Sequence, residues 1–80
     1  MDRIEILRQI NIIFAELLDN QNIQITEATV AYDIEDWDSL MHLQLAVAIE
    51  KNFEVRFNLQ EIQSWVGVKD IIDSVVQRLN

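Results

Sequence analysis

The sequence predicts an all-α fold, a small four-helix bundle of three longer helices and one short helix. Three segments carry apolar residues at the spacing of one helix face, and the single brief alternation, "NIQIT", has no later partner strand. The chain of 80 residues has no proline and one glycine, so little interrupts its helices. Its apolar fraction of 50% suffices for one core and is too high for a disordered chain. We therefore expect residues 1–80 to form a single domain.

The first helix is predicted over about residues 3–18. Its apolar stripe consists of Ile6, Leu7, Ile10, Ile13, Phe14 and Leu17. Asp2 is placed to cap its start, with Glu5 as the reciprocal partner three residues later. Residues 19–38 show no sustained period and are predicted to form a long loop. Loops of this length in small domains are commonly functional, so we expect it to lead to a site.

The second helix, predicted over about residues 39–52, has two apolar sectors. The first sector contains Leu40, Leu43 and Val47, and the second contains Met41, Leu45, Ala48 and Ile49. A surface helix needs only one apolar stripe. Either this helix is central and buried on both sides, or one sector is exposed to a partner.

The last part of the chain predicts two further helices. Asn58 and Glu61 form a capping pair that opens a short helix over residues 59–64. Gly67 then separates this helix from a final apolar stripe, which consists of Val68, Ile71, Ile72, Val75, Val76 and Leu79.

Charge and composition exclude several classes of function. The net charge of −8 repels a phosphate backbone, so no nucleic-acid partner is expected, whereas it favours docking with proteins that carry basic patches. The chain has no cysteine, which excludes disulfides and thiol catalysis. No apolar run approaches the length of a membrane span, and the N-terminus does not resemble a signal peptide. We expect a cytoplasmic monomer.

Ser39 stands out because four carboxylates precede it, in the segment "DIEDWDSL": Asp33, Glu35, Asp36 and Asp38. A serine at a helix start commonly caps the helix, which would make Ser39 purely structural. Asp38 is placed to do the same, however, and would leave the Ser39 hydroxyl free to point outward. The residues alone leave both interpretations open.

Neighbouring residues do not complete another kind of site. The spacing of the acidic residues fails the pattern of a calcium-binding loop, because Asp38 falls where glycine is needed. His42 is the one histidine, and we interpret it as an exposed residue without a special role. Trp37 and Trp65 are interpreted as packing groups that anchor the end of the loop and the short helix.

Residues 33–53 resemble the acyl carrier protein family. The match includes the Asp38-Ser39-Leu40 triplet, the preceding Trp37, and the helix that ends in "AIEKNFEVRF". It continues through "VGVKDIIDSVV", so it covers almost the whole chain and implies the acyl-carrier-protein-like bundle, with no enzymatic activity of its own.

The resemblance implies that a phosphopantetheinyl transferase attaches phosphopantetheine from coenzyme A to Ser39, with Asp38 positioning the metal ion of that enzyme. Acyl-loading and acyl-using biosynthetic enzymes would then be the partners. Their expected contacts are the apolar residues Leu40, Leu43 and Val47 and the acidic residues Glu35, Asp36, Asp38 and Glu50. An acyl chain would be sheltered among Met41, Leu45, Ala48, Ile49 and Phe53.

Two departures limit the resemblance. Asp36 stands where the family usually has glycine, which puts the turn before Ser39 in question. The helix after Ser39 is also less acidic than in fatty-acid carriers, so we expect a dedicated biosynthetic pathway. Two alternatives remain: an aminoacyl or peptidyl carrier of the same architecture, and an unmodified helical adaptor. Modification of Ser39 separates the adaptor from the carriers.

Overall fold

The structure, a computed structural model, describes all residues 1–80. It contains α1 (Arg3–Leu17), a short 3₁₀ turn η1 (Ala31–Asp33), α2 (Ser39–Phe53), α3 (Leu59–Ser64) and α4 (Val68–Leu79). The all-α prediction is confirmed, and each predicted helix ends within about one residue of its observed limit. None of these helices has the length and apolar character needed to cross a membrane.

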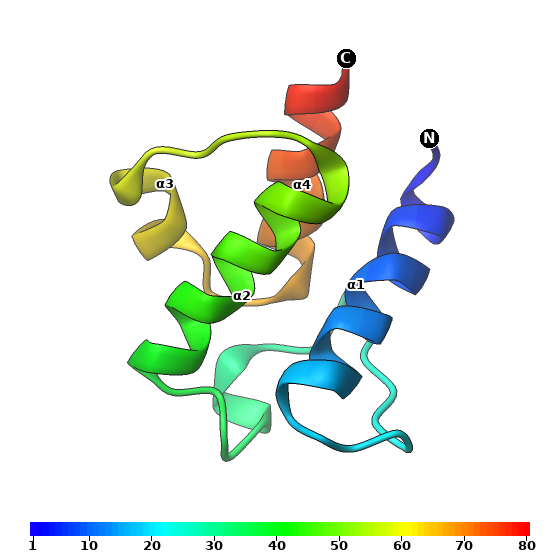
Figure 1. The fold of residues 1–80 in the computed structure, drawn as a ribbon, viewed down its shortest axis with the longest axis vertical. Helices are drawn as coiled ribbons and strands as arrows, with labels where there is room; N and C mark the ends of the chain where they lie inside the picture. The colour runs from blue at the N-terminus through cyan, green and yellow to red at the C-terminus, as the bar shows by residue number, and fades with distance from the viewer.

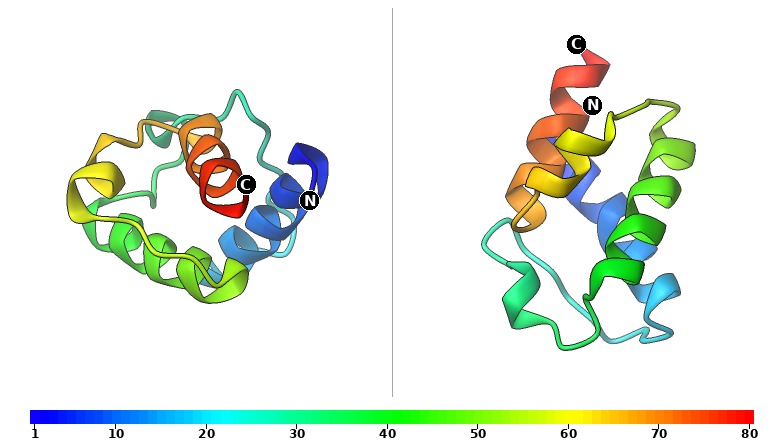
Figure 2. Two further views of the ribbon diagram at one scale, coloured as in Figure 1. Left: turned by 90° about the horizontal axis from the view of Figure 1, so that it is seen from above. Right: turned by 90° about the vertical axis from the view of Figure 1, so that its left-hand side faces the viewer.

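The helices surround one core. α1 packs against α2 and α4, while α3 lies beside α2 on the side away from α1 (Figures 1 and 2). Both termini lie at one end of the bundle, and the beginning of α2 lies at the opposite end. The side chains without any exposed surface come mainly from the predicted stripes: Ile6, Ile10, Phe14, Leu45, Ile49, Val68, Ile71, Ile72 and Val75.

Side-chain caps begin three of the helices, as the sequence predicts. Asp2 accepts from the Glu5 amide at 2.9 Å, and Asn58 accepts from the Glu61 amide at 2.7 Å. The predicted reciprocal bond from Glu5 is wrong, because its carboxylate instead accepts from Arg8 and Gln9. These bonds, chiefly the one from Arg8, lower the pKa of Glu5 to about 2.

The long loop is held against the rest of the protein by an isolated antiparallel bridge between Val30 and Gly67. The Ala31 amide donates to the Val66 carbonyl, and the Val68 amide donates to the Thr29 carbonyl, both at 2.9 Å. The bridge thus joins the loop to the junction of α3 and α4, close to the cleft described below. Sequence periodicity could not reveal it, because it is a single residue pair without a strand on either side.

Gly67 is required at this bridge because the two backbones approach closely. Its φ of −163° is open to any residue, but an added Cβ would lie 2.6 Å from the Thr29 carbonyl oxygen. We expect Gly67→Ala to lower the free energy of unfolding by about 1–3 kcal/mol, as overpacking commonly does. Urea unfolding measures this, with Val66→Ala as an exposed control beside it. An unchanged stability of Gly67→Ala would contradict the close approach.

An ion-pair cluster ties the loop and α4 to the start of α1. Arg3 donates to Glu27 at 2.6 Å and 3.1 Å, and to Asp73 at 2.7 Å. The bond from Arg3 lowers the pKa of Glu27 from its ordinary 4.5. Bonds from Lys69 and then Arg3 lower the pKa of Asp73 from its ordinary 3.8.

Because both pKa values are lower in the folded protein, the unfolded chain binds more protons in acid, and the stability from the cluster is lost as the pH falls. We expect Arg3→Met to lower the melting temperature by a few degrees at neutral pH. The difference in melting temperature between Arg3→Met and the parent protein should shrink as the pH falls from about 5 to about 2. Arg56→Met is the control, since no ion pair joins Arg56 to an acidic side chain. A difference independent of pH would contradict this assignment.

Candidate functional site

Ser39 is the first residue of α2 and is exposed. The Asp38 carboxylate caps the helix, accepting from the Met41 amide at 2.8 Å. The Ser39 hydroxyl makes no hydrogen bond within the protein, so the cap does not occupy it. Of the two interpretations of the sequence, the one with Asp38 as the cap is confirmed. Ser39 therefore presents a free hydroxyl at the positive end of the helix dipole.

The acidic residues before Ser39 lie at the surface but do not converge. Glu35, Asp36 and Asp38 are exposed, while the Asp33 carboxylate accepts from the Val30 amide at 3.1 Å. No three acidic or histidine side chains of the protein gather closely enough to hold a metal ion. Asp36, at the position where glycine was expected, does not have a positive φ. The turn before Ser39 therefore accommodates its side chain without strain.

α2 divides into one exposed and one buried apolar sector. Leu40, Leu43 and Val47 are 65%, 47% and 52% exposed. Met41, Leu45 and Ile49 are buried, Ala48 is half-buried, and Phe53 at the helix end is buried. The interpretation with one sector open to solvent is therefore correct. The exposed sector runs along α2 from Ser39.

Glu50, the fourth acidic residue expected to face partners, lies in a different setting. It is half-buried, and its carboxylate accepts from the Phe57 amide at 2.8 Å. This bond holds the segment between α2 and α3 against α2. Glu50 is thus engaged within the protein, and the exposed sector of α2 is almost free of negative charge.

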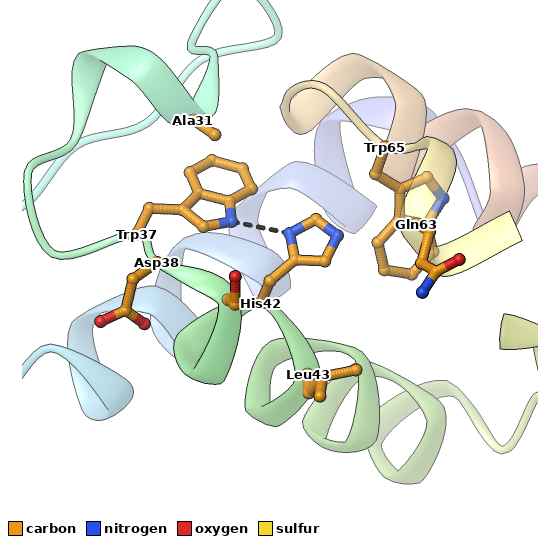
Figure 3. A pocket seen from close by; sticks show the side chains of 8 residues that line it. Ala31, Trp37, Asp38, His42, Leu43, Gln63 and Trp65 are labelled. Atoms are coloured by element: carbon orange, nitrogen blue, oxygen red, sulfur yellow. Dashed lines mark hydrogen bonds between the residues drawn. The ribbon is translucent and has the colours of Figure 1, made fainter. Parts of the chain in front are cut away.

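His42 is half-buried, so the prediction that it is an exposed residue without a special role is wrong. Its Nδ1 accepts from the Trp37 indole Nε1 at 2.9 Å, and its Nε2 lies 2.7 Å from the Ile62 carbonyl oxygen. The ring lies between Trp37 and Trp65 (Figure 3). The signal in the sequence was the tryptophan five residues earlier, but only the fold brings Ile62 and Trp65 to the same place.

Both tryptophans act as the predicted anchors. Trp37 is buried, and its ring meets Phe14 of α1 edge-on at 5.1 Å. Trp65 is buried after α3, and its indole Nε1 donates to the Ser74 hydroxyl of α4 at 2.9 Å. They fix the end of the loop before Ser39 and the end of the short helix.

A cleft of about 540 Å³ opens beside Ser39, between the first turns of α2 and the end of α3 (Figure 3). Its lining consists of Ala31, Trp37, Asp38, Ser39, His42, Leu43, Gln63 and Trp65. None of the five residues expected to shelter an acyl chain lines it. Those five side chains belong to the packed interior of the bundle or lie against it.

The cap at Asp38 supports a prediction about stability. Asp38→Ala should lower the free energy of unfolding by about 1 kcal/mol, because the Met41 amide loses its acceptor. Asp38→Ser keeps an acceptor of the right kind and should stay within about 0.5 kcal/mol of the parent protein. Equilibrium unfolding in urea measures both variants. Equal losses for alanine and serine would show that the carboxylate does more than cap the helix.

Comparisons with known proteins agree with this architecture. A scan against models of protein families and a search of curated proteins each gave no match. Among solved structures, the chain is similar to a holo acyl carrier protein from Geobacter metallireducens, determined by NMR in solution. The TM-score is 0.83 with 37% sequence identity, over 91% of this chain and 84% of that one. This chain therefore belongs to the acyl carrier protein family, a family of carriers that serve biosynthetic enzymes and are not enzymes themselves.

Proposed function

We propose that Ser39 is the attachment point for phosphopantetheine, transferred from coenzyme A by a separate phosphopantetheinyl transferase. The observation that carries this proposal is the free, exposed Ser39 hydroxyl at the first position of α2, with Asp38 as the cap. When bound, the arm supplies a terminal thiol that holds an acyl group as a thioester. The similar solved structure is described as the holo form of its protein, which supports the same modification here.

The residues around Ser39 suit this group. A phosphodiester on the Ser39 oxygen would lie at the N-terminus of α2, where the helix dipole favours negative charge. Asp38 is exposed and retains one carboxylate oxygen outside the cap, which is available to the metal ion of the transferase. Because the transferase supplies the chemistry, Ser39 needs no catalytic base within this chain, and none is hydrogen-bonded to it.

The partners are enzymes that load the acyl group and use it, in a fatty-acid, polyketide or related pathway. Leu40, Leu43 and Val47 would form the apolar centre of their contact, with Glu35, Asp36 and Asp38 at its edge. Since Glu50 is the only acidic residue of α2 and binds the Phe57 amide, an enzyme that requires an acidic α2 should bind weakly. This supports a dedicated pathway. Binding to general fatty-acid elongation enzymes as tight as that of their own carrier would contradict it.

Incubation with coenzyme A and a broad-specificity phosphopantetheinyl transferase tests the modification. We expect the intact mass to increase by one arm, and Ser39→Ala to abolish the increase. Ser64→Ala is the matched control, since Ser64 is also an exposed serine and should leave the increase unchanged. No increase in the parent protein would favour the unmodified adaptor. An aminoacyl or peptidyl carrier would show the same increase and differ in the enzyme that loads it.

A further inference from the structure

His42 connects two segments that flank the cleft beside Ser39. An indole N–H can only donate, so Nδ1 of His42, which receives the bond from Trp37, carries no proton. A carbonyl oxygen can only accept, so Nε2 carries the proton and donates to the Ile62 carbonyl of α3. Both ring nitrogens are thereby satisfied in one neutral tautomer. We refer to Trp37, His42 and the Ile62 carbonyl as the His42 latch.

Aromatic packing reinforces the latch. The Trp37 and His42 rings meet at their hydrogen-bonded edges, with centroids 6.0 Å apart and planes at 26°. On its other side His42 meets Trp65 at 5.8 Å, and Trp65 in turn meets Phe57 edge-on at 5.1 Å. The row of rings therefore runs from Trp37, before α2, through Trp65 at the end of α3 to Phe57, in the segment between α2 and α3. Figure 3 shows His42 between Trp37 and Trp65, and all three line the cleft.

The side chains behind the latch belong to the buried core. Leu45, one turn after His42 on α2, is fully buried, as is Ile49 a further turn along. Ile62, whose carbonyl forms part of the latch, is also buried. An acyl chain that passes from the cleft beside Ser39 into the core between α2 and α3 would have to break the bond between His42 and Ile62. Left in water, the same chain would lose the favourable free energy of burying its methylene groups.

We propose that the His42 latch excludes the acyl group from the core, so that this carrier takes short or hydrogen-bonding acyl groups and not long alkyl chains. The inference rests on the proposed attachment at Ser39 and deepens it by naming the class of cargo. The open cleft outside the latch agrees with this class. Its lining combines the Trp37 and Trp65 side chains with Gln63, whose amide makes no hydrogen bond within the protein.

NMR of the carrier loaded with acetyl or octanoyl groups, from the matching coenzyme A thioesters, tests the proposal. In the parent protein, the methyl signals of Leu45 and Ile49 should coincide in the two loaded forms. In His42→Ala, which removes the latch, octanoyl should shift these signals and acetyl should not. His42→Gln keeps an acceptor and a donor on one side chain and should behave like the parent protein. Gln63→Ala, which changes the cleft but not the latch, is the matched control.

If the methyl signals of Leu45 and Ile49 in the parent protein differ between the octanoyl and acetyl forms, the proposal that the latch excludes the acyl group is wrong. An imidazole ¹⁵N spectrum that places the His42 proton on Nδ1 would also overturn it, and this spectrum needs no loading. If His42→Ala does not fold, the comparison within the parent protein and the tautomer still decide the question. A chain that gains no mass with any coenzyme A thioester refutes the proposed attachment itself. A carrier that is loaded but buries its octanoyl group would instead refute only the exclusion by the latch.

Discussion

Replacing Trp37 with alanine is expected to lower the free energy of unfolding by about 3–5 kcal/mol. The variant loses a buried ring, its edge-on contact with Phe14 and its hydrogen bond to His42. A domain of this length has a total stability of only about 4–12 kcal/mol, so the variant should be close to unfolding. Urea denaturation followed by far-ultraviolet circular dichroism measures the change.

Trp37→Phe is the control that separates packing from hydrogen bonding. It keeps an aromatic ring against Phe14 but leaves Nδ1 of His42 without a donor, so we expect a smaller loss of about 1–2 kcal/mol. Equal losses in the two variants would mean that the indole N–H, and not the buried ring, provides most of the stability. Equal and negligible losses would mean that Trp37 does not anchor the loop.

Replacing Leu45 with alanine is expected to lower the free energy of unfolding by about 2–5 kcal/mol, because Leu45 is fully buried and its removal leaves a cavity. Leu43→Ala makes the same chemical change two residues earlier on α2. Since Leu43 is 47% exposed, its loss should be within about 1 kcal/mol. Unfolding of the two variants in parallel thus measures how the two sectors of α2 differ. Similar losses of unfolding free energy in Leu45→Ala and Leu43→Ala would contradict the division of α2 into one buried and one exposed sector.

The pair also tests docking, because Leu43 lies in the expected partner stripe. If Leu43→Ala is as stable as the parent protein but no longer binds a loading enzyme, the loss of binding must come from the altered contact surface. Leu45→Ala should impair the same interaction only in proportion to the fraction that is unfolded.

The sequence was sufficient to predict the helices because their determinants are local. Apolar residues at helical spacing define the buried faces of α1 and α4, and Asp2, Asp38 and Asn58 occupy the cap positions. The same local logic placed Ser39 at the beginning of a helix, but it left open whether the Ser39 hydroxyl caps the helix or is free; the structure shows that Asp38 is the cap. The two sectors of α2 were visible too, but only the packed structure shows which of them is covered.

Features that depend on residues distant in the chain could not be predicted. The bridge between Val30 and Gly67 joins positions far apart in the sequence through backbone groups alone. The partner of His42 is the carbonyl of Ile62, which every residue type possesses, so its identity carries no signal. Glu50 was expected to face partners because its charge is visible in the sequence, whereas its bond to the Phe57 amide is not.

In the living cell, the Ser39 oxygen is expected to carry the phosphopantetheine arm. Mass spectrometry of the protein isolated from its own organism, first intact and then as peptides, tests this directly. We predict a population heavier by one phosphopantetheine, with the added mass on the peptide that contains Ser39. Isolation of only the unmodified chain from growing cells, or an arm on any other residue, would contradict the account.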